Sequence, residues 1–419
     1  MPSDVPTPPA AARDRPPLGP VPPSQRALAP DLARGTVLLL IALANGAGAF
    51  FLAAPGLESA PQGAERLYNV AMVAFVHARA YPMFAFLLGY GMVQLARRQE
   101  AAASPGAGRA VLLRRSAWLL AFGALHGILL FSGDILGAYG IVGIAVALLL
   151  LGRGDRFHRL ALWLWAASIV SVAVLAARAA WLVATASGTP ASMPIREMDV
   201  GWPSMEAPTY AASVLARLTE WPTQTLYLLG VVFVVWLGVW AARHRVLEEP
   251  ARHRRLLAWT AGVGLTAGVA GGLPMGLFSA GWLHADAPAA GALKALYEAS
   301  GQLGGIGYVA LFGLIALALE NRRPAARRPK AVGAVVDALT ALGQRSLSGY
   351  LIQSVAWLVL VPPFALGLGT ASGSTAFTAT ACAAGVWLAT VVAADQLRRR
   401  SLPGPAEVLL RRLVYGRRN

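Results

Sequence analysis

Apolar and polar segments alternate along nearly the whole chain. The apolar segments run for 16 to 24 residues, and about 20 apolar residues in a helix cross the hydrocarbon core of a bilayer. The residue-by-residue alternation of an outer-membrane barrel strand is absent. The pattern predicts an all-α fold, a polytopic membrane protein with about ten transmembrane helices. The predicted spans are residues 36–54, 81–96, 112–131, 135–151, 160–182, 222–242, 257–280, 299–319, 347–367 and 374–396.

The composition agrees with this fold, and the distribution of basic residues predicts how the helices are oriented in the membrane. Charged residues make up only 13% of the chain, whereas soluble domains carry about 25%. Of the 36 lysines and arginines, 30 fall in six segments that share one face of the predicted topology. By the positive-inside rule, this face and both termini are cytoplasmic. The six segments are the tail through Arg34, residues 97–115, 152–159, 243–256 and 320–346, and the tail from residue 397.

The net charge of +16 also bears on partners. Because the basic residues follow the topology, we interpret the surplus as orientation plus attraction to anionic lipids. Membrane lipids are therefore the expected partners, and nucleic acid is not. The histidines of the loop 243–256 lie in RHR and RHRR, without an HExxH or CxxC pattern, so we expect no metal site.

Three regions follow from the pattern. Residues 1–30 contain ten prolines and no apolar periodicity, which predicts a disordered cytoplasmic tail. Residues 31–396 form the helical transmembrane domain. Residues 397–419 are expected to hold a cytoplasmic helix at 404–416, with Pro405 in its first turn and two arginines turned toward headgroups or solvent.

The stretch LHGILLFSGDILGAYG, residues 125–140, places two ionisable groups in an apolar region. His126 lies eleven residues beyond Arg115, about 16 Å deeper into the membrane at 1.5 Å per residue. It is either a neutral histidine bonded across helices or a general base or substrate ligand. Asp134 either only caps the next helix or also holds the His126 ring. Gly123 and Gly127 would let a neighbouring helix approach closely.

Further polar residues are predicted to reach the same layer. The segment 65–80 is expected to lie along or re-enter the outer interface, and it carries Asn69, His77 and Arg79. We expect His126 and Asp134 to line an outward-leaning cavity together with His77 or Arg79. Snorkelling would explain Arg79 without a function, and Asn45 in the first span could serve only to join helices.

Two other segments carry interpretations of their own. The outer loop 184–221, which includes Arg196, Glu197 and Asp199, is either a lid over an outer cavity or a surface segment without such a role. GIGYVA at 305–310 matches a dinucleotide-binding pattern but lies in a predicted span without a preceding strand. Its glycines, with Gly301 at GxxxG spacing, instead predict a close helix contact.

Several of these segments resemble one family. DLARGTVLLLIALAN at 31–45, FAFLLGYGMVQLARR at 84–98 and LHGILLFSGDILGAYG at 125–140 resemble motifs of the YeiB-like bacterial inner-membrane proteins. LGQRSLSGYLIQS at 342–354 and GPAEVLLRRLVYG at 404–416 resemble the closing motif of the same family, which carries a domain of unknown function, number 418. The resemblance implies a multi-pass protein of the bacterial cytoplasmic (inner) membrane, with a role in the cell envelope.

That family is similar to a wider group of transmembrane acyltransferases. The resemblance implies transfer of an acyl group from a cytoplasmic thioester donor to an outward-facing envelope sugar or lipid. Acyl-CoA would then be a co-substrate, and no tightly bound cofactor is expected. Arg34, Arg97 and Arg98 would hold the donor's phosphates. The implied catalytic candidates are His126, Asp134 and His77. The implied substrate-binding candidates are Asn45, Arg79, Tyr139, Arg34, Tyr350 and Gln353.

The chain departs from its relatives at two points, and other functions stay open. Better-understood relatives carry a working histidine near the outer end of the first span, but residues 36–58 contain none, so the base would be His77 or His126. Gly349 stands where many YeiB-like sequences have asparagine. A transporter or flippase of an envelope lipid or glycan would use a polar intramembrane layer equally well. A non-catalytic lipid-binding membrane component is the third reading.

Overall fold

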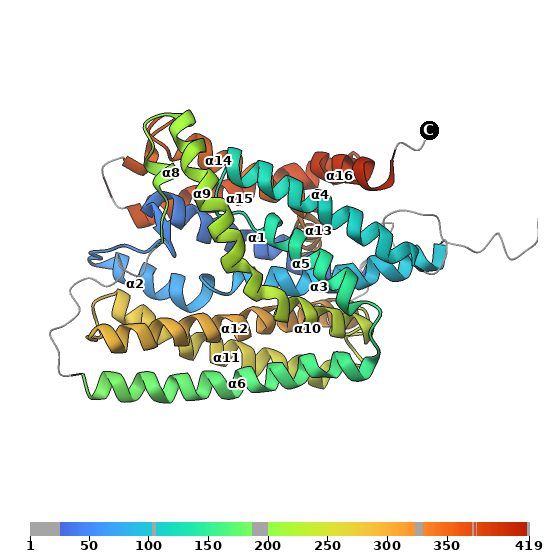
Figure 1. The fold of residues 1–419 in the computed structure, drawn as a ribbon, viewed down its shortest axis with the longest axis horizontal. Helices are drawn as coiled ribbons and strands as arrows, with labels where there is room; N and C mark the ends of the chain where they lie inside the picture. Colours follow the sequence, from blue (N-terminus) through green and yellow to red (C-terminus); the bar gives the residue numbers. More distant parts are fainter. Residues whose placement is uncertain are drawn as a thin grey trace, which may run out of the picture.

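The computed structural model describes residues 26–102, 106–186, 200–322, 330–370, 373 and 375–416. Most of the predicted N-terminal tail lies outside these ranges, as do Arg196, Glu197 and Asp199. The described chain is helical apart from two short paired strands (Figure 1). Its elements are α1 (Leu28–Phe51), β1 (Ala53–Ala54), α2 (Ala64–Ala71), the π-helical η3 (Met72–Val76), α3 (Ala80–Ala102), α4 (Ala107–Leu129), α5 (Leu136–Ala145), the π-helical η4 (Val146–Leu150), α6 (Asp155–Ala184), β2 (Val200–Gly201), α8 (Pro203–Glu206), α9 (Tyr210–Leu228), the 3-10 turn η5 (Leu229–Val231), α10 (Val232–Arg243), α11 (Arg254–Ser279), α12 (Ala287–Arg322), α13 (Lys330–Gln344), α14 (Ser346–Leu360), the 3-10 turn η7 (Leu368–Thr370), α15 (Thr375–Arg399) and α16 (Pro405–Tyr415).

Each of the ten predicted spans coincides with a helix, and most of these helices run along the long axis of the molecule (Figure 1). Within the described residues, seven helices are long and apolar enough to cross a membrane. α5 with η4 and α14 are shorter apolar helices, and α4 is long but carries Arg109, Arg114 and Arg115 in its first half. The fold is therefore that of a helical, multi-pass membrane protein. The number ten and the side of the termini stay predictions.

Two predicted boundaries are wrong. The span predicted at 222–242 belongs to a longer helical run that begins at Tyr210, because Pro222 lies inside α9 without ending it. A proline removes one backbone hydrogen bond, and a helix can continue through it with a local adjustment. The span predicted at 299–319 is the second part of α12, which starts at Ala287.

The chain is interrupted between η3 and α3, inside the bundle. His77 is extended and Ala78 has a φ of +60°, so the helical hydrogen bonding breaks at these two residues. Gly301 and Gly305 of α12 lie against the break, where a Cβ atom would overlap Ala78 or the Arg79 carbonyl. The close helix contact predicted from the GxxxG spacing is confirmed, and Arg79 is enclosed by it.

The turn between α4 and α5 is tightly packed on both sides. A Cβ atom at Gly123 would overlap the backbone of Gly137 at the start of α5. Gly127 and Gly137 together leave the space that the indole of Trp221 from α9 fills. Gly123 and Gly127 thus allow close approach, as predicted, one to the next helix and the other to a side chain.

The C-terminal helix α16 is fastened to the start of α14. The Glu407 carboxylate accepts hydrogen bonds from two backbone N–H groups of that turn, at 2.9 and 3.2 Å, and from the Ser348 hydroxyl at 2.5 Å. Ser348 Oγ in turn accepts the backbone N–H of Ala406 at 3.0 Å. Leu410 and Val414 are buried. The helix predicted at 404–416 is confirmed, and each of the two helices caps the other.

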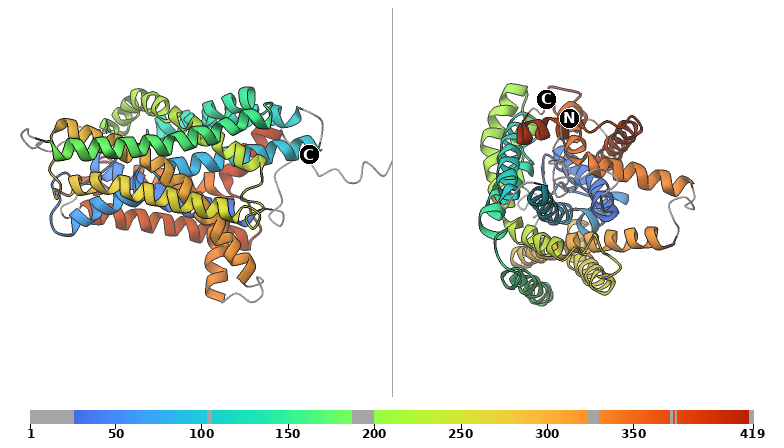
Figure 2. Two further views of the ribbon diagram at one scale, coloured as in Figure 1. Left: turned by 90° about the horizontal axis from the view of Figure 1, so that it is seen from below. Right: turned by 90° about the vertical axis from the view of Figure 1, so that its right-hand side faces the viewer.

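Two parts of the molecule extend from the bundle. α6 runs along its periphery and exposes most of its length, including Trp163 and Trp181, which are 73% and 65% exposed. The end of α12 and the start of α13 project to one side (Figure 2). Apolar surfaces of this kind suit contact with lipid.

Candidate functional site

His126 and Asp134 form a buried hydrogen-bonded pair. His126 Nδ1 lies 2.8 Å from Asp134 Oδ1, and the two side chains are 1% and 0% exposed. The same carboxylate accepts the backbone N–H groups of Leu136 at 3.1 Å and Gly137 at 2.7 Å. Asp134 therefore caps α5 and also holds the histidine, which is the second of the two readings that the sequence offered. The predicted pairing of the two residues is confirmed.

A fourth donor reaches this carboxylate from far along the chain. Trp221 Nε1 lies 3.3 Å from Asp134 Oδ2, with its indole seated against Gly127 and Gly137. With Nδ1–H donated to that carboxylate, the other ring nitrogen of His126 carries the lone pair. His126 Nε2 is buried and has no hydrogen-bond partner among the described residues.

A cavity of about 840 Å³ lies on the basic side of this pair. Along α3 its lining changes from Arg98 through Gly91 to Phe84, and along α4 from Arg115 to Leu119. The cavity is therefore charged toward the basic face and apolar toward its inner end. Seven of its lining residues are arginines: Arg26, Arg34, Arg97, Arg98, Arg115, Arg245 and Arg411.

Only three carboxylates line the same cavity, so positive charge is in excess there. Asp31 lies 3.4 Å from Arg34 and 3.7 Å from Arg26, while Glu407 is engaged at the start of α14. Burial lowers the pKa of Arg411 on α16, and the nearby positive charge of Arg26 lowers it further. An anionic ligand would stabilise these crowded guanidinium groups.

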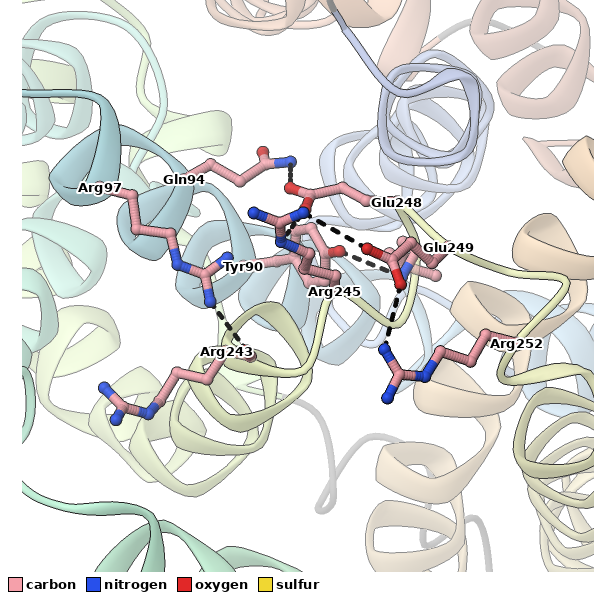
Figure 3. A network of polar contacts seen from close by, with 9 residues as sticks. Tyr90, Gln94, Arg97, Arg243, Arg245, Glu248, Glu249 and Arg252 are labelled. Atoms are coloured by element: carbon pink, nitrogen blue, oxygen red, sulfur yellow. Dashed lines mark hydrogen bonds and ion pairs between the residues drawn. The ribbon is translucent and has the colours of Figure 1, made fainter. Parts of the chain in front are cut away.

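A polar network fixes the loop after α10 at the cavity wall (Figure 3). Gln94 Nε2 donates to the third carboxylate, Glu248, at 2.6 Å, and Arg245 Nε lies 3.9 Å from the same group. Arg97 donates to the Arg243 carbonyl at 2.8 Å. The network holds both signs of charge in place at the cavity.

Tyr350 connects the cavity with the buried pair. It lines the cavity, and its ring centroid lies 5.0 Å from that of His126. The backbone N–H of Ile135, which follows Asp134, donates to the Tyr350 hydroxyl at 3.4 Å. The Tyr350 ring thus separates the cavity from His126 at this point.

The structure divides the predicted site residues into two groups. Arg34, Tyr139 and Tyr350 line the cavity. Asn45, on α1, lies outside the lining, and Gln353 donates to the Leu38 carbonyl at 3.2 Å. With Arg97 and Arg98, which the resemblance assigned to the donor's phosphates, these placements bring five of the predicted residues together at the cavity. The roles of all of them stay predictions.

His77 and Arg79 belong to a separate place. Arg79 is 1% exposed, donates to the His77 carbonyl at 2.6 Å and to the Gly268 carbonyl, and lies over the Tyr297 ring. Asn69, from the same segment, bonds Glu58 and Ser279 backbone groups. Among the described residues, no hydrogen bond or ion pair joins this group to His126 or Asp134.

The cavity described above differs from the one that the sequence predicts. The sequence suggested an outward-leaning cavity lined by His126, Asp134 and either His77 or Arg79, but none of these four lines the cavity described above. The Trp221 indole lies against Gly127 and Gly137 beside the buried pair. Arg411, predicted to face headgroups or solvent, lines the cavity, because its place on α16 turns it toward α4.

The described part of the outer loop covers the buried pair. The side chains of Tyr210 and Arg217 on α9 both donate to the Leu129 carbonyl at the end of α4, at 3.0 and 3.1 Å. Glu220 accepts the Ser204 hydroxyl at 2.6 Å and backbone N–H at 2.8 Å. Residues 200–221 therefore contact the end of α4 and the turn that carries Asp134, and the lid reading stays a prediction.

Sequence reasoning missed several residues of the site. Arg115, Arg245 and Glu248 line the cavity, but the arginines had been interpreted as topology signals only. Trp221, which lies next to Pro222 inside α9, was not predicted to reach Asp134. Arg115 and His126 lie eleven residues apart on one helix, about three turns, so helical spacing could have placed them on the same face.

Comparisons with known proteins bear on the second half of the chain. Residues 241–417 match the model of a family described as "Protein of unknown function (DUF418)". This region supplies Tyr350, Glu248 and Arg411 to the cavity, while His126 and Asp134 lie before it.

Two curated relatives match shorter stretches. Over 114 residues the chain is 34% identical to the "Uncharacterized 39.9 kDa protein in amylase 3'region" of Bacillus acidopullulyticus, covering 27% of this chain and 31% of that protein. Over 90 residues it is 36% identical to the "Uncharacterized protein YxaH" of Bacillus subtilis (strain 168), covering 21% of each. The matches span less than a third of each relative. The chain is thus a helical protein with several candidate membrane spans whose residues 241–417 are similar to the DUF418 family of unknown function.

Proposed function

We propose that this protein is an acyltransferase of the bacterial cytoplasmic membrane. It takes an acyl group from a cytoplasmic thioester donor, such as acyl-CoA, and places it on a hydroxyl of an outward-facing envelope sugar or lipid. The observation that carries the proposal is His126, whose Nδ1 bonds Asp134 and whose Nε2 has no partner in the described part of the chain, next to an arginine-lined cavity. A carboxylate–histidine pair of this geometry is the arrangement that general-base catalysis of acyl transfer uses.

The proposed step assigns the proton transfers to His126. Nε2 removes the proton of the acceptor hydroxyl as its oxygen attacks the thioester carbonyl carbon. The tetrahedral intermediate then collapses, the carbon–sulfur bond breaks, and the imidazolium returns the proton to the leaving thiolate. Asp134 stabilises the imidazolium while it exists. The products are an ester and a free thiol.

The proposed donor site is the cavity. Acyl-CoA carries several phosphate charges and a long arm that ends in the thioester. The phosphates match the charged end of the cavity, and the acyl end matches its apolar end. Guanidinium groups bind phosphate oxygens through paired, charge-assisted hydrogen bonds. Arg34 and Arg115, on two helices that face the cavity, supply such groups.

Donor binding is tested with coenzyme A and protein reconstituted in lipid nanodiscs. Arg115→Gln is expected to weaken binding about tenfold or more, because a hydrogen bond to a charged group contributes about 1.5–3 kcal/mol. Arg252→Gln is the matched control, since this arginine belongs to the same basic face but does not line the cavity. Isothermal titration measures both affinities, and equal effects of the two variants would reject the cavity as the donor site.

Transfer is tested with radiolabelled acetyl-CoA and membranes from the native host as acceptor. Asp134→Asn should keep the cap of α5, because asparagine caps about as well as aspartate. It should nevertheless lower transfer about 100-fold or more, as the loss of a histidine-orienting carboxylate does. Full transfer by this variant would refute the proposed mechanism.

A second function, transport of an envelope lipid or glycan, has one observation in its favour. The chain break at His77 and Ala78 places Arg79 inside the bundle without a carboxylate partner among the described residues. Interrupted helices and intramembrane charges mark substrate paths in transporters. The test measures how fast a fluorescent lipid is flipped in proteoliposomes. Flipping at the same rate by the native protein and by Asp134→Asn would favour this alternative.

A further inference from the structure

Tyr350 occupies the boundary between the donor cavity and the base. It stands in the second turn of α14, lines the cavity, and presses its ring against that of His126 at 5.0 Å between centroids and 41° between planes. The residue is 3% exposed. A group in this position meets whatever reaches the inner end of the cavity.

The Tyr350 hydroxyl has a hydrogen to donate. Its oxygen accepts the Ile135 N–H at 3.4 Å, but within the described part of the chain its own hydrogen meets no acceptor. Tyr139, which lines the same part of the cavity, differs in this respect because its hydroxyl donates to the Tyr81 carbonyl at 3.1 Å. Of these two hydroxyls, therefore, only that of Tyr350 is available to a ligand.

We propose that Tyr350 is a catalytic residue whose hydroxyl donates a hydrogen bond to the carbonyl oxygen of the bound thioester. This inference rests on the proposed acyl transfer and adds the electrophilic group that the reaction needs. When the acceptor oxygen bonds to the carbonyl carbon, negative charge develops on the carbonyl oxygen, and the Tyr350 O–H stabilises it. The charge returns to sulfur when the carbon–sulfur bond breaks, and His126 protonates that sulfur.

The arrangement also separates the two substrates. Tyr350 belongs to the cavity side and works on the donor, whereas His126 lies behind it and works on the acceptor. A thioester carbonyl at the Tyr350 hydroxyl would lie at the shared wall of the two compartments. Transfer from a cytoplasmic donor to an outward-facing acceptor requires the substrates to meet at such a wall.

The test uses acetyl-CoA with purified protein in nanodiscs and thiol release as the readout, with water or added lipid extract as acceptor. Tyr350→Phe keeps the ring against His126 and removes only the hydroxyl. Turnover should fall about 100-fold, as it does when one donor to a developing oxyanion is removed. The affinity for coenzyme A should stay within about twofold, because the bond strengthens only in the transition state.

Tyr90→Phe is the matched control. Tyr90 is fully buried and its hydroxyl also accepts a distant backbone N–H, that of Leu247 at 3.0 Å, but it does not line the cavity. This variant should retain native turnover. A purely structural role of Tyr350 predicts equal, small losses for both variants, together with a lower melting temperature.

The outcomes separate this inference from the function on which it rests. Native thiol release that Asp134→Asn abolishes and Tyr350→Phe leaves intact overturns the role of Tyr350 alone. A loss of coenzyme A affinity in Tyr350→Phe as large as the loss of turnover also overturns it, since the hydroxyl would then act in binding. No thiol release by the native protein overturns the proposed function and this inference together.

Discussion

Two buried histidines, His126 and His77, lie in contrasting surroundings. His126 bonds a carboxylate that four donors hold, and it lies one ring away from a large basic cavity. His77 lies at a chain break beside Arg79, which is held by backbone carbonyls and an aromatic ring. Both groups place ionisable side chains at membrane depth, where each is costly. The comparison teaches that the bonding partner distinguishes the two places. Backbone carbonyls and close packing can satisfy the buried charge of Arg79 without creating a reactive group, whereas a carboxylate orients the His126 ring.

The largest expected effect separates the two histidines. His126→Gln should lower acetyl transfer about 1,000-fold, within the range for loss of a positioned general base. His77→Gln should leave turnover within about twofold, since its ring has no contact with the reacting groups in the proposed mechanism. Steady-state transfer with labelled acetyl-CoA measures both. Equal losses would break the comparison and place both histidines in one site.

The second prediction concerns Arg79 and stability. Arg79→Met keeps the length of the side chain but leaves the Gly268 and His77 carbonyls without their charged donor. We expect a loss of about 2–3 kcal/mol in the free energy of unfolding, the contribution of hydrogen bonds from a charged group. Denaturant titration in micelles measures this loss. Unchanged stability with impaired lipid flipping would instead show that Arg79 serves a transport path.

The smallest expected effect tests the cover over His126. Trp221→Phe keeps an aromatic ring against Gly127 and Gly137 and removes the N–H that reaches Asp134 at 3.3 Å. Because this bond is long, turnover should fall only about threefold, which corresponds to about 0.7 kcal/mol. Trp202→Phe is the control, since its indole packs edge-on against Phe131 without a hydrogen bond from its N–H to a described residue. Similar losses in both variants would assign the effect to packing.

Sequence reasoning reached the fold and the central pair because both are local. Apolar length identifies the helices, and eight residues of helix end, turn and cap bring His126 and Asp134 together. It did not reach the contact of Trp221 with Asp134, which lies 87 positions away, or that of Arg79 with Gly268, which lies 189 positions away. These contacts depend on how helices pack, which periodicity does not specify.

The cavity illustrates the same limit in another way. Arg34, Tyr139 and Tyr350 were predicted as substrate-binding residues, but the sequence did not show that they meet in one cavity. Arg115, Arg245 and Arg411 had one sufficient explanation, orientation in the membrane, so their convergence on a cavity added no further signal in the sequence. Charge at a membrane face can serve topology and binding at once.

The reciprocal cap between Glu407 and Ser348 has a consequence for biosynthesis. One wall of the cavity comes from α1 and the residues just before it, at Arg34 and Arg26, and another comes from α16, at Glu407 and Arg411. A ribosome synthesises α1 long before α16. The cavity therefore closes only after α16 has been synthesised, and a chain truncated before α16 would hold its arginines without an enclosed site.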